Sequence, residues 1–506
     1  MTEAPADWAP VLELTCATPE LRDLWRTGVL LNDAAPLELR TRVIEECGHG
    51  DPLLNGLTYM ALPEAVVDAW IAHPVARVRA RAAERVGLTV AQQKRLLRDE
   101  SAGVRGVVLL VGGPDLALDE AEFDRLLADA SPIVREQLAC QQQLSVRQLT
   151  LLLGDPFGSV RAAVVGRVWP YLDEATRAAL SADRHSGVRA AAVLARYADE
   201  PLPAGEFAAL TDGCEEADRR RIVGQCALAP ELAGELAHGD VDVRRALAGN
   251  PRLDADLVAL LARDEDPAVR LTVSLRPELT EAERARIPVD IDPGSHHAAL
   301  PWVLERQGDA AEMRRCAASA HVLVRRSVAH VRDLPADVVE LLARDEDFAV
   351  RLLLAEHCAQ AAAGLLLEMW VSWNGYSQPR LREHPNFPRA GSLRFAADPN
   401  PLLRRLALDD PAAPEDLVEL VERFGRDKDA GVRLRALEDP RLSAASVERL
   451  VGDEDWLVRC RALRDPRLPE AALVGLIADV RTAQGAASHP AVPAEVLRHL
   501  LELPVV

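Results

Sequence analysis

A short phrase in which acidic residues precede a Val-Arg pair recurs along the chain and restricts its fold more than any other feature. The phrase reads DEDPAVR at residues 264–270, DEDFAVR at 345–351 and DEDWLVR at 453–459. Aligned on the arginine, or its nearest equivalent, it recurs at Arg79, Arg105, Arg135, Arg161, Arg189, Arg219, Arg244, Arg270, Arg325, Arg351, Arg404, Arg433 and Arg459. Most steps are 25 to 30 residues, and two are double, at 55 and 53 residues. A fixed period of this size is typical of a solenoid, and each double step should contain one degenerate unit.

Each repeat has the pattern of two helices. The acidic residues before Val-Arg, such as Asp266 and Asp347, are placed to cap the N-terminus of a first helix. That helix should be short, because in five repeats a proline stands seven residues after the arginine. A longer second helix is expected to follow, as in DADLVALLARD at residues 254–264, whose apolar residues form one stripe.

These positions together resemble the leucine-rich repeat variant, and VDVRRALAGNPRLDADLVALLARDED at residues 241–266 is the clearest copy. The resemblance extends over residues 72–501 and implies an all-α, right-handed superhelical α-solenoid, similar in layout to HEAT repeats. Its repeats would have about 26 residues, with one short and one longer helix. Some members of the family carry an N-terminal cysteine cluster for an iron–sulfur centre. Only Cys16 and Cys47 lie near the start of this chain, so that feature is not expected here. The family implies a scaffold and no reaction.

The positions of the repeats predict four regions. We expect a helical N-terminal cap over residues 1–70, regular repeats over 71–287, degenerate repeats with irregular loops over 288–400, and regular repeats with a C-terminal cap over 401–506. A cap would cover the apolar face of a terminal repeat. The last helix carries Leu500, Leu501 and Leu503, which could form either a fraying cap or a docking edge for another chain.

The charge of the chain disfavours free nucleic acid as a partner. The 506 residues include 59 basic and 79 acidic side chains, for a formal net charge of −20, and such a chain repels phosphate at long range. Because acids and arginine recur in step, stacked repeats should bring them together as ion pairs. This structural interpretation of the arginines is favoured over a ladder that binds a polyanion. Only Lys94 and Lys428 are lysines, which is typical of a GC-rich, bacterial genome.

The eight cysteines are scattered without a C-x-x-C pair, which is typical of reduced thiols in a cytoplasmic protein. The N-terminus has no signal-peptide pattern, and no apolar run is long enough to span a membrane. The sequence thus predicts a soluble cytoplasmic chain without a membrane partner, and leaves its oligomeric state open.

Function on a solenoid tends to lie where the repeats depart from consensus, and the two double steps are such places. Residues 288–309 contain His296, His297 and Trp302, and solvated histidines in an irregular loop are favoured there over a metal site. Residues 368–395 concentrate aromatic and basic side chains in a chain with only 4% aromatics. The candidate binding residues in this second segment are Trp370, Trp373, Tyr376, Arg380 and His384. Their aromatic rings could instead fill the gap left by a missing repeat helix, and the two interpretations are of equal weight.

No catalytic or cofactor-binding motif stands in the sequence, such as G-x-x-x-x-G-K-[ST], G-x-G-x-x-G, G-x-S-x-G or H-E-x-x-H. We therefore expect no cofactor and no catalytic residue, although missing motifs do not exclude an enzyme. The favoured hypothesis is a non-enzymatic scaffold that binds a protein or peptide with aromatic and arginine anchors. The alternative is a nucleic-acid-acting solenoid similar to the HEAT-like DNA glycosylases, and the Trp- and Arg-rich segment is the one feature that favours it.

Overall fold

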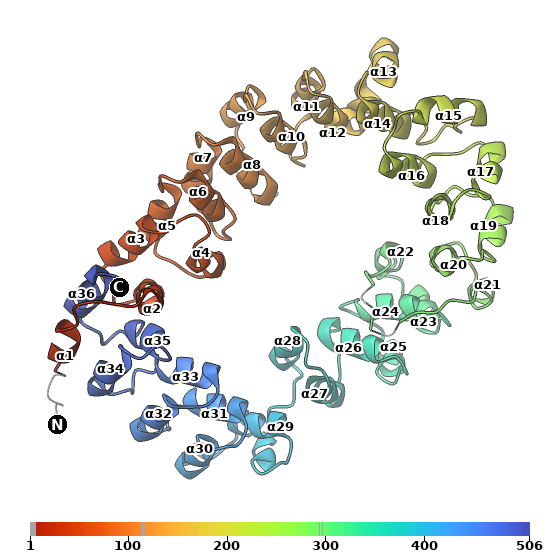
Figure 1. Cartoon of the computed structure of the whole chain (residues 1–506). Helices are drawn as coiled ribbons and strands as arrows, with labels where there is room; N and C mark the ends of the chain where they lie inside the picture. Colours follow the sequence, from red (N-terminus) through yellow and green to blue (C-terminus); the bar gives the residue numbers. More distant parts are fainter. Residues whose placement is uncertain (1–6, 113–115, 117, 293, 296) are drawn as a thin grey trace. The chain divides into compact units, whose positions relative to one another are not determined.

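The fold is known from a computed structural model that describes residues 7–112, 116, 118–292, 294–295 and 297–506. Within these residues the regular elements are all helices, joined by short turns (Figure 1). Backbone pairing outside the helices is limited there to two isolated bridges, Ala17 with Val505 and Leu202 with Leu228. The chain is therefore an all-α solenoid, as the repeat pattern predicts.

The chain divides into two compact units. Unit 1 joins the two ends of the chain, residues 1–122 and 389–506, and unit 2 is residues 123–388. The N-terminal part of unit 1 contains α1 (Ala9–Leu12), α2 (Pro19–Leu31), α3 (Leu37–Glu45), α4 (Pro52–Leu57), α5 (Glu64–Ile71), α6 (Ala76–Ala83), α7 (Val90–Leu97) and α8 (Ala102–Val111), and α9 (Glu120–Leu127) spans the boundary. Its C-terminal part contains η3 (Ser392–Phe395), α29 (Pro401–Leu406), η4 (Ala407–Asp409), α30 (Val418–Phe424), α31 (Ala430–Leu437), α32 (Ala444–Leu450), α33 (Trp456–Ala462), α34 (Glu470–Leu476), α35 (Ala483–Ala487) and α36 (Ala494–Glu502).

Unit 2 consists of successive helix pairs. Its helices are α10 (Pro132–Ala139), α11 (Val146–Leu153), α12 (Gly158–Val168), η2 (Trp169–Tyr171), α13 (Glu174–Ser181), α14 (Ser186–Arg196), α15 (Ala204–Thr211), α16 (Glu216–Gln225), α17 (Pro230–Leu236), α18 (Val241–Ala248), α19 (Ala255–Leu261), α20 (Pro267–Ser274), α21 (Glu281–Arg284), α22 (Pro301–Glu305), α23 (Ala310–Ala317), α24 (Val322–Ala329), α25 (Ala336–Leu342), α26 (Phe348–His357), α27 (Ala363–Ser372) and α28 (Gln378–Glu383). The first helices of successive repeats, such as α14, α16, α18 and α20, pack against one another. In Figure 1 they form the inner layer of this unit, and the second helices α15, α17, α19 and α21 form the outer layer.

The capping aspartates predicted from the sequence begin these helices. The Asp266 carboxylate accepts hydrogen bonds from the N–H groups of Ala268 and Val269 at the start of α20. Val269 and Val273 of that helix are fully buried in the hydrophobic core. The two helices of a repeat are nearly equal in length, at eight residues for α18 and seven for α19, whereas the apolar pattern predicts a longer second helix. The difference arises because α19 begins only after its cap, Asp254, and ends at Leu261 before the acidic turn of the next repeat.

Both double steps contain a degenerate repeat, as predicted. The first contains the short helix α22 followed by α23, and the second contains α28 followed by the single 3-10 turn η3. The repeats therefore continue through both irregular regions, with short helices at α22, α28 and η3.

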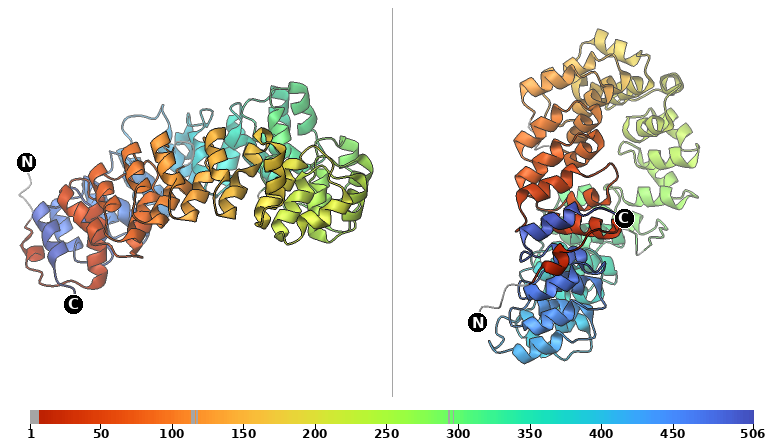
Figure 2. Two further views of the ribbon diagram at one scale, coloured as in Figure 1. Left: turned by 90° about the horizontal axis from the view of Figure 1, so that it is seen from above. Right: turned by 60° about the vertical axis from the view of Figure 1, so that its left-hand side comes forward.

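The two ends of the chain pack against each other within unit 1 (Figures 1 and 2). Helix α2 contacts α35 and α36, and the Trp25 Nε1–H donates a 2.7 Å hydrogen bond to the Ile477 carbonyl. Leu500, Leu501 and Leu503 are at most 3% exposed, and Arg22 donates to the carbonyls of Leu501 and Leu503. The C-terminal leucines are thus covered by the N-terminal helices of the same chain.

Candidate functional site

The repeated arginines form a ladder between neighbouring repeats. Arg244 on α18 contacts both carboxylate oxygens of Asp264 in the next repeat, at 2.8 Å from Nε and 3.2 Å from Nη2. Its Nη1 donates to the Gly239 carbonyl at 2.9 Å. The same pairing, with the aspartate 20 to 23 residues after the arginine, occurs for Arg79–Asp99, Arg135–Asp155, Arg161–Asp183, Arg244–Asp264, Arg325–Asp345, Arg404–Asp427 and Arg433–Asp453. This set confirms the structural interpretation of these arginines.

The ladder aspartates also shape the turn before the next helix. The Asp264 carboxylate accepts a hydrogen bond from the Asp266 N–H at 2.9 Å, and the Asp264 carbonyl accepts one from Arg270 at 2.8 Å. Burial alone would raise the pKa of Asp264, but the hydrogen bonds from Arg244 and from this N–H outweigh it and lower the pKa. The carboxylate is therefore held ionised beside its arginine.

The ladder is interrupted at several positions, among them Arg270, where the next repeat is degenerate, and Arg189 and Arg459, which donate to backbone carbonyls. Arg270 donates to the backbone carbonyls of Asp264, Glu265 and Pro288, and no carboxylate in the described chain lies within ion-pair distance of it. Arg351 donates to the carbonyls of Asp345 and Glu346, and the one carboxylate within ion-pair distance of it in the described chain is that of Glu368, at 3.7 Å. The expectation of an ion pair is therefore wrong for Arg270, because the segment that should supply an aspartate presents the carbonyl of Pro288 instead.

The predicted binding segment begins with a buried tryptophan. Trp370, near the end of α27, is 4% exposed and meets Phe387 edge to face, with ring centroids 5.8 Å apart. The Gln378 side chain donates to the Trp370 carbonyl at 2.9 Å and to the Trp373 carbonyl at 2.5 Å. Trp370 thus fills the space between α27 and the degenerate repeat that follows.

Trp373 is half-buried and fixes the turn between α27 and α28. Its Nε1–H donates to the Ser377 hydroxyl at 2.9 Å, and its ring lies 6.2 Å from that of Phe348. A Cβ atom on Gly375 would stand 2.0 Å from the indole ring, so the turn requires glycine for space. The indole and the backbone of the turn are therefore packed tightly together.

Two of the five candidate residues face solvent. Tyr376 is 87% exposed at the tip of this turn, and the exposed Arg380 follows on α28. His384 instead joins neighbouring repeats, because its Nε2 lies 3.1 Å from the Cys358 carbonyl and its Nδ1 accepts from the Asn386 N–H. The segment therefore combines a packed base, formed by Trp370, Trp373 and His384, with an exposed tip at Tyr376 and Arg380.

The second candidate region is held by contacts within its own segment and with the preceding repeat. His296 lies outside the described residues, and His297 Nε2 is 2.8 Å from the Ser295 hydroxyl. Trp302 donates from Nε1 to the Leu275 carbonyl at 3.0 Å, and the guanidinium carbons of Arg284 and Arg306 lie 5.6 and 5.3 Å from its ring centroid. In the described residues, no group of three or more His, Cys, Asp or Glu side chains could hold a metal ion.

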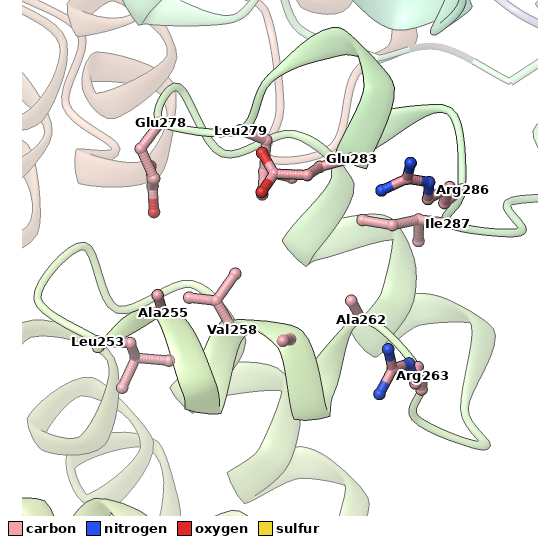
Figure 3. Close-up of a pocket in the computed structure, with 11 residues that line it drawn as sticks. Leu253, Ala255, Val258, Ala262, Arg263, Glu278, Leu279, Glu283, Arg286 and Ile287 are labelled. Atoms are coloured by element: carbon pink, nitrogen blue, oxygen red, sulfur yellow. The ribbon is translucent and has the colours of Figure 1, made fainter.

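Sequence reasoning missed a groove between the second helices α19 and α21 (Figure 3). It has a volume of about 510 Å³ and is lined by both apolar and charged side chains. The available signal was the segment TEAERARIP at residues 280–288, in which a proline follows the start of the second helix too closely for a full-length helix.

The fold and these surfaces define an α-solenoid built from two-helix repeats. Among solved structures, the chain is similar to one described as a leucine-rich repeat variant with a novel repetitive structural motif, the family that the repeat resembles. The identity is 23% over 44% of this chain and 84% of that chain, with a TM-score of 0.25. A microtubule polymerase with TOG domain arrays, described for tubulin recruitment and assembly, is 12% identical over 93% of this chain and 98% of its own, with a TM-score of 0.19. The S. pombe condensin Cnd3–Cnd2 subcomplex is 12% identical over 96% of this chain and 73% of its own, with a TM-score of 0.20.

No family model and no curated protein matches the sequence. Across the part of the chain that the structure describes, no helix combines the length and the apolar character needed to cross a membrane.

Proposed function

We propose that the chain is a non-enzymatic scaffold that binds a protein or peptide at the α27–α28 turn. The main supporting observation is that Tyr376 is 87% exposed at the tip of this turn. The close packing of the Trp373 indole on Gly375 holds the turn in one conformation. An exposed aromatic ring on a fixed turn loses little conformational freedom when it binds. Tyrosine and arginine are common anchors of protein interfaces, and Arg380 stands beside this turn.

The disposition of arginine supports a protein partner over nucleic acid. Nucleic-acid binding requires basic side chains that are free to meet phosphate. In this chain most of the repeated arginines contact aspartates of the next repeat, and the net charge is −20. The ladder therefore offers few unneutralised charges to a polyanion.

The proposal can be tested with Tyr376→Ala and a matched variant, Tyr59→Ala. Tyr59 is 84% exposed and belongs to unit 1, whereas the turn belongs to unit 2. Proteins captured from the source cell by each immobilised variant are compared by quantitative mass spectrometry. We expect a specific protein to be lost with Tyr376→Ala and retained with Tyr59→Ala. With that protein purified, Tyr376→Ala should weaken binding by about 1–3 kcal/mol.

Arg380→Gln should weaken the same interaction, and the melting temperature of both variants should match that of the unchanged chain. If Tyr376→Ala and Tyr59→Ala capture the same proteins in equal amounts, the turn is not the binding site. Capture that disappears after nuclease treatment would instead favour the nucleic-acid alternative.

A further inference from the structure

The groove between α19 and α21 is open because the second helix of its repeat is unusually short. Helix α21 begins at a capping box, in which Thr280 and Glu283 exchange hydrogen bonds, and it has only four residues. The equivalent helix α25 has seven residues. The chain then turns away at Ile287 and Pro288, so that one flank of α19 is left uncovered.

The groove has an apolar lining. Leu253, Val258 and Ala262 line it from the side of α19, and Leu279 and Ile287 line it from the side of α21 (Figure 3). Its volume of about 510 Å³ is within the range of sites that bind small ligands or short peptide segments. An apolar side chain can therefore be buried here.

The acidic side chains at the groove are already engaged by this chain. The Glu278 carboxylate accepts a hydrogen bond from Arg276. The Glu283 carboxylate accepts from the N–H and the hydroxyl of Thr280, and these bonds lower its pKa. Glu278 is therefore neutralised by Arg276, whereas Glu283 stays ionised and interacts electrostatically with the nearby Arg286.

The basic side chains at the groove differ from these glutamates in their contacts. Arg263 and Arg286 are exposed at the same end of the groove in Figure 3, and neither has an ion pair or side-chain hydrogen bond in the described chain. Most arginines of the ladder are neutralised by an aspartate. Two guanidinium groups without a direct ion pair, against the one ionised carboxylate of Glu283, leave a net positive charge at the groove, which suits a carboxylate that is attached to an apolar group.

We propose that this groove binds the C-terminus of a peptide, with its last apolar side chain in the groove and its terminal carboxylate between Arg263 and Arg286. The positive charge is concentrated at one end of the groove, which matches a chain end better than an acidic side chain within a longer segment. This site does not depend on the α27–α28 turn, so either proposal can fail without the other.

The test uses the full chain and a defined probe. The probe is a pool of fluorescein-labelled ten-residue peptides whose last three positions are randomised over Leu, Ile, Val, Phe and Met. One pool has a free C-terminal carboxylate, a second has a C-terminal amide, and a third is an amide pool with one internal aspartate. Binding is followed by fluorescence anisotropy. We expect saturable binding of the free-acid pool and about tenfold weaker binding of both amide pools.

Variants separate the two parts of the site. Arg263→Gln and Arg286→Gln should each weaken binding of the free-acid pool several-fold and leave binding of the amide pool without aspartate unchanged. Ala259→Trp should block the groove, because Ala259 lines it and is exposed. It should therefore weaken binding of the free-acid pool and of the amide pool without aspartate. The matched control is Arg344→Gln, because Arg344 occupies the same position after α25, in the same LLARDED sequence, is also exposed, and does not line the groove.

All four substitutions change exposed residues, so the melting temperature should stay constant. Equal binding of acid and amide pools, an equal effect of Arg344→Gln, or no saturable binding of the free-acid pool would each overturn the proposal. Stronger binding of the internal-aspartate pool would also overturn it, since an acidic side chain would then be the ligand.

Discussion

At the scale of single residues, the ladder pairs join repeats through groups that are largely removed from water. In the Arg135–Asp155 pair, Nε and Nη2 contact the two carboxylate oxygens at 2.6 and 3.1 Å, and both residues are buried. Arg135→Ala would leave the Asp155 carboxylate buried without its counter-ion. Loss of one member of a buried pair costs about 3–5 kcal/mol, so we expect a clearly lower midpoint of urea unfolding.

Arg270→Ala is the control for this prediction. Arg270 occupies the same repeat position but donates only to three backbone carbonyls, and no carboxylate is left behind when it is removed. Its loss should cost less than the loss of Arg135, because two of these three bonds are exposed and water can replace the donor there. Equal shifts of the two unfolding midpoints would show that ion pairing contributes nothing to the role of these arginines.

The sequence predicts the ladder because acids and arginines recur in phase. It does not predict which arginine lacks a partner. The aspartate that pairs with each arginine lies 20 or more residues later, and its position depends on the backbone of the next repeat. At Arg270 that repeat is degenerate, and the Pro288 carbonyl takes the place of the carboxylate.

At the scale of helices and turns, the packing of Trp373 on Gly375 determines whether the α27–α28 turn keeps its shape. Gly375→Ala would place a Cβ atom 2.0 Å from the indole ring, so the ring or the backbone must move. We expect faster amide hydrogen exchange over residues 373–378. The overall melting temperature should change little, because the turn lies outside the packed helices.

Gly364→Ala is the matched substitution, since it lies in α27 and a Cβ atom there meets no atom within 4 Å. Alanine should even favour the helix slightly at that position. Unchanged exchange in Gly375→Ala, or a similar increase in Gly364→Ala, would mean that the turn does not depend on the Trp373 contact.

The position of this turn could be predicted from the sequence, because the repeat pattern breaks there and aromatic residues gather. Whether each aromatic ring is buried or exposed could not be predicted from the sequence. Trp370 and Tyr376 both belong to the same polar and aromatic segment, yet one is 4% and the other 87% exposed. The α19–α21 groove was missed for a related reason. It depends on how far α21 extends, and helix ends are poorly determined by apolar spacing alone.

At the scale of the whole molecule, local periodicity establishes the solenoid but not the contact between the chain ends. That contact joins residues more than 450 positions apart, and no spacing in the sequence records it. Two separate caps were expected over residues 1–70 and in the C-terminal region. Within unit 1, α2 instead packs on α35 as one first helix packs on the previous one.

Two buried asparagines support the interpretation that α2 packs on α35 as a first helix packs on the previous one, and they provide a test of it. After α18, the Asn250 amide donates to the carbonyls of Val223 and Cys226 in the previous repeat, at 2.7 and 2.8 Å. After α2, the Asn32 amide donates to the carbonyls of Ala487 and His489, at 3.1 and 2.9 Å. Both asparagines are at most 1% exposed. Helix α2 is therefore attached to the last repeat by the contact that joins neighbouring repeats elsewhere.

Asn32→Ala should consequently destabilise the two ends of the chain together. Removing the amide leaves two buried carbonyls without a donor, a loss of about 1–3 kcal/mol. We expect faster hydrogen exchange in both α2 and α35, measured by mass spectrometry on the intact chain. Asn250→Ala removes the same contact within unit 2 and should raise exchange in α16 and α18 while leaving both chain ends protected. If Asn32→Ala raises exchange in α2 alone, the C-terminal repeat is stable without its neighbour and the ends are not joined as repeats.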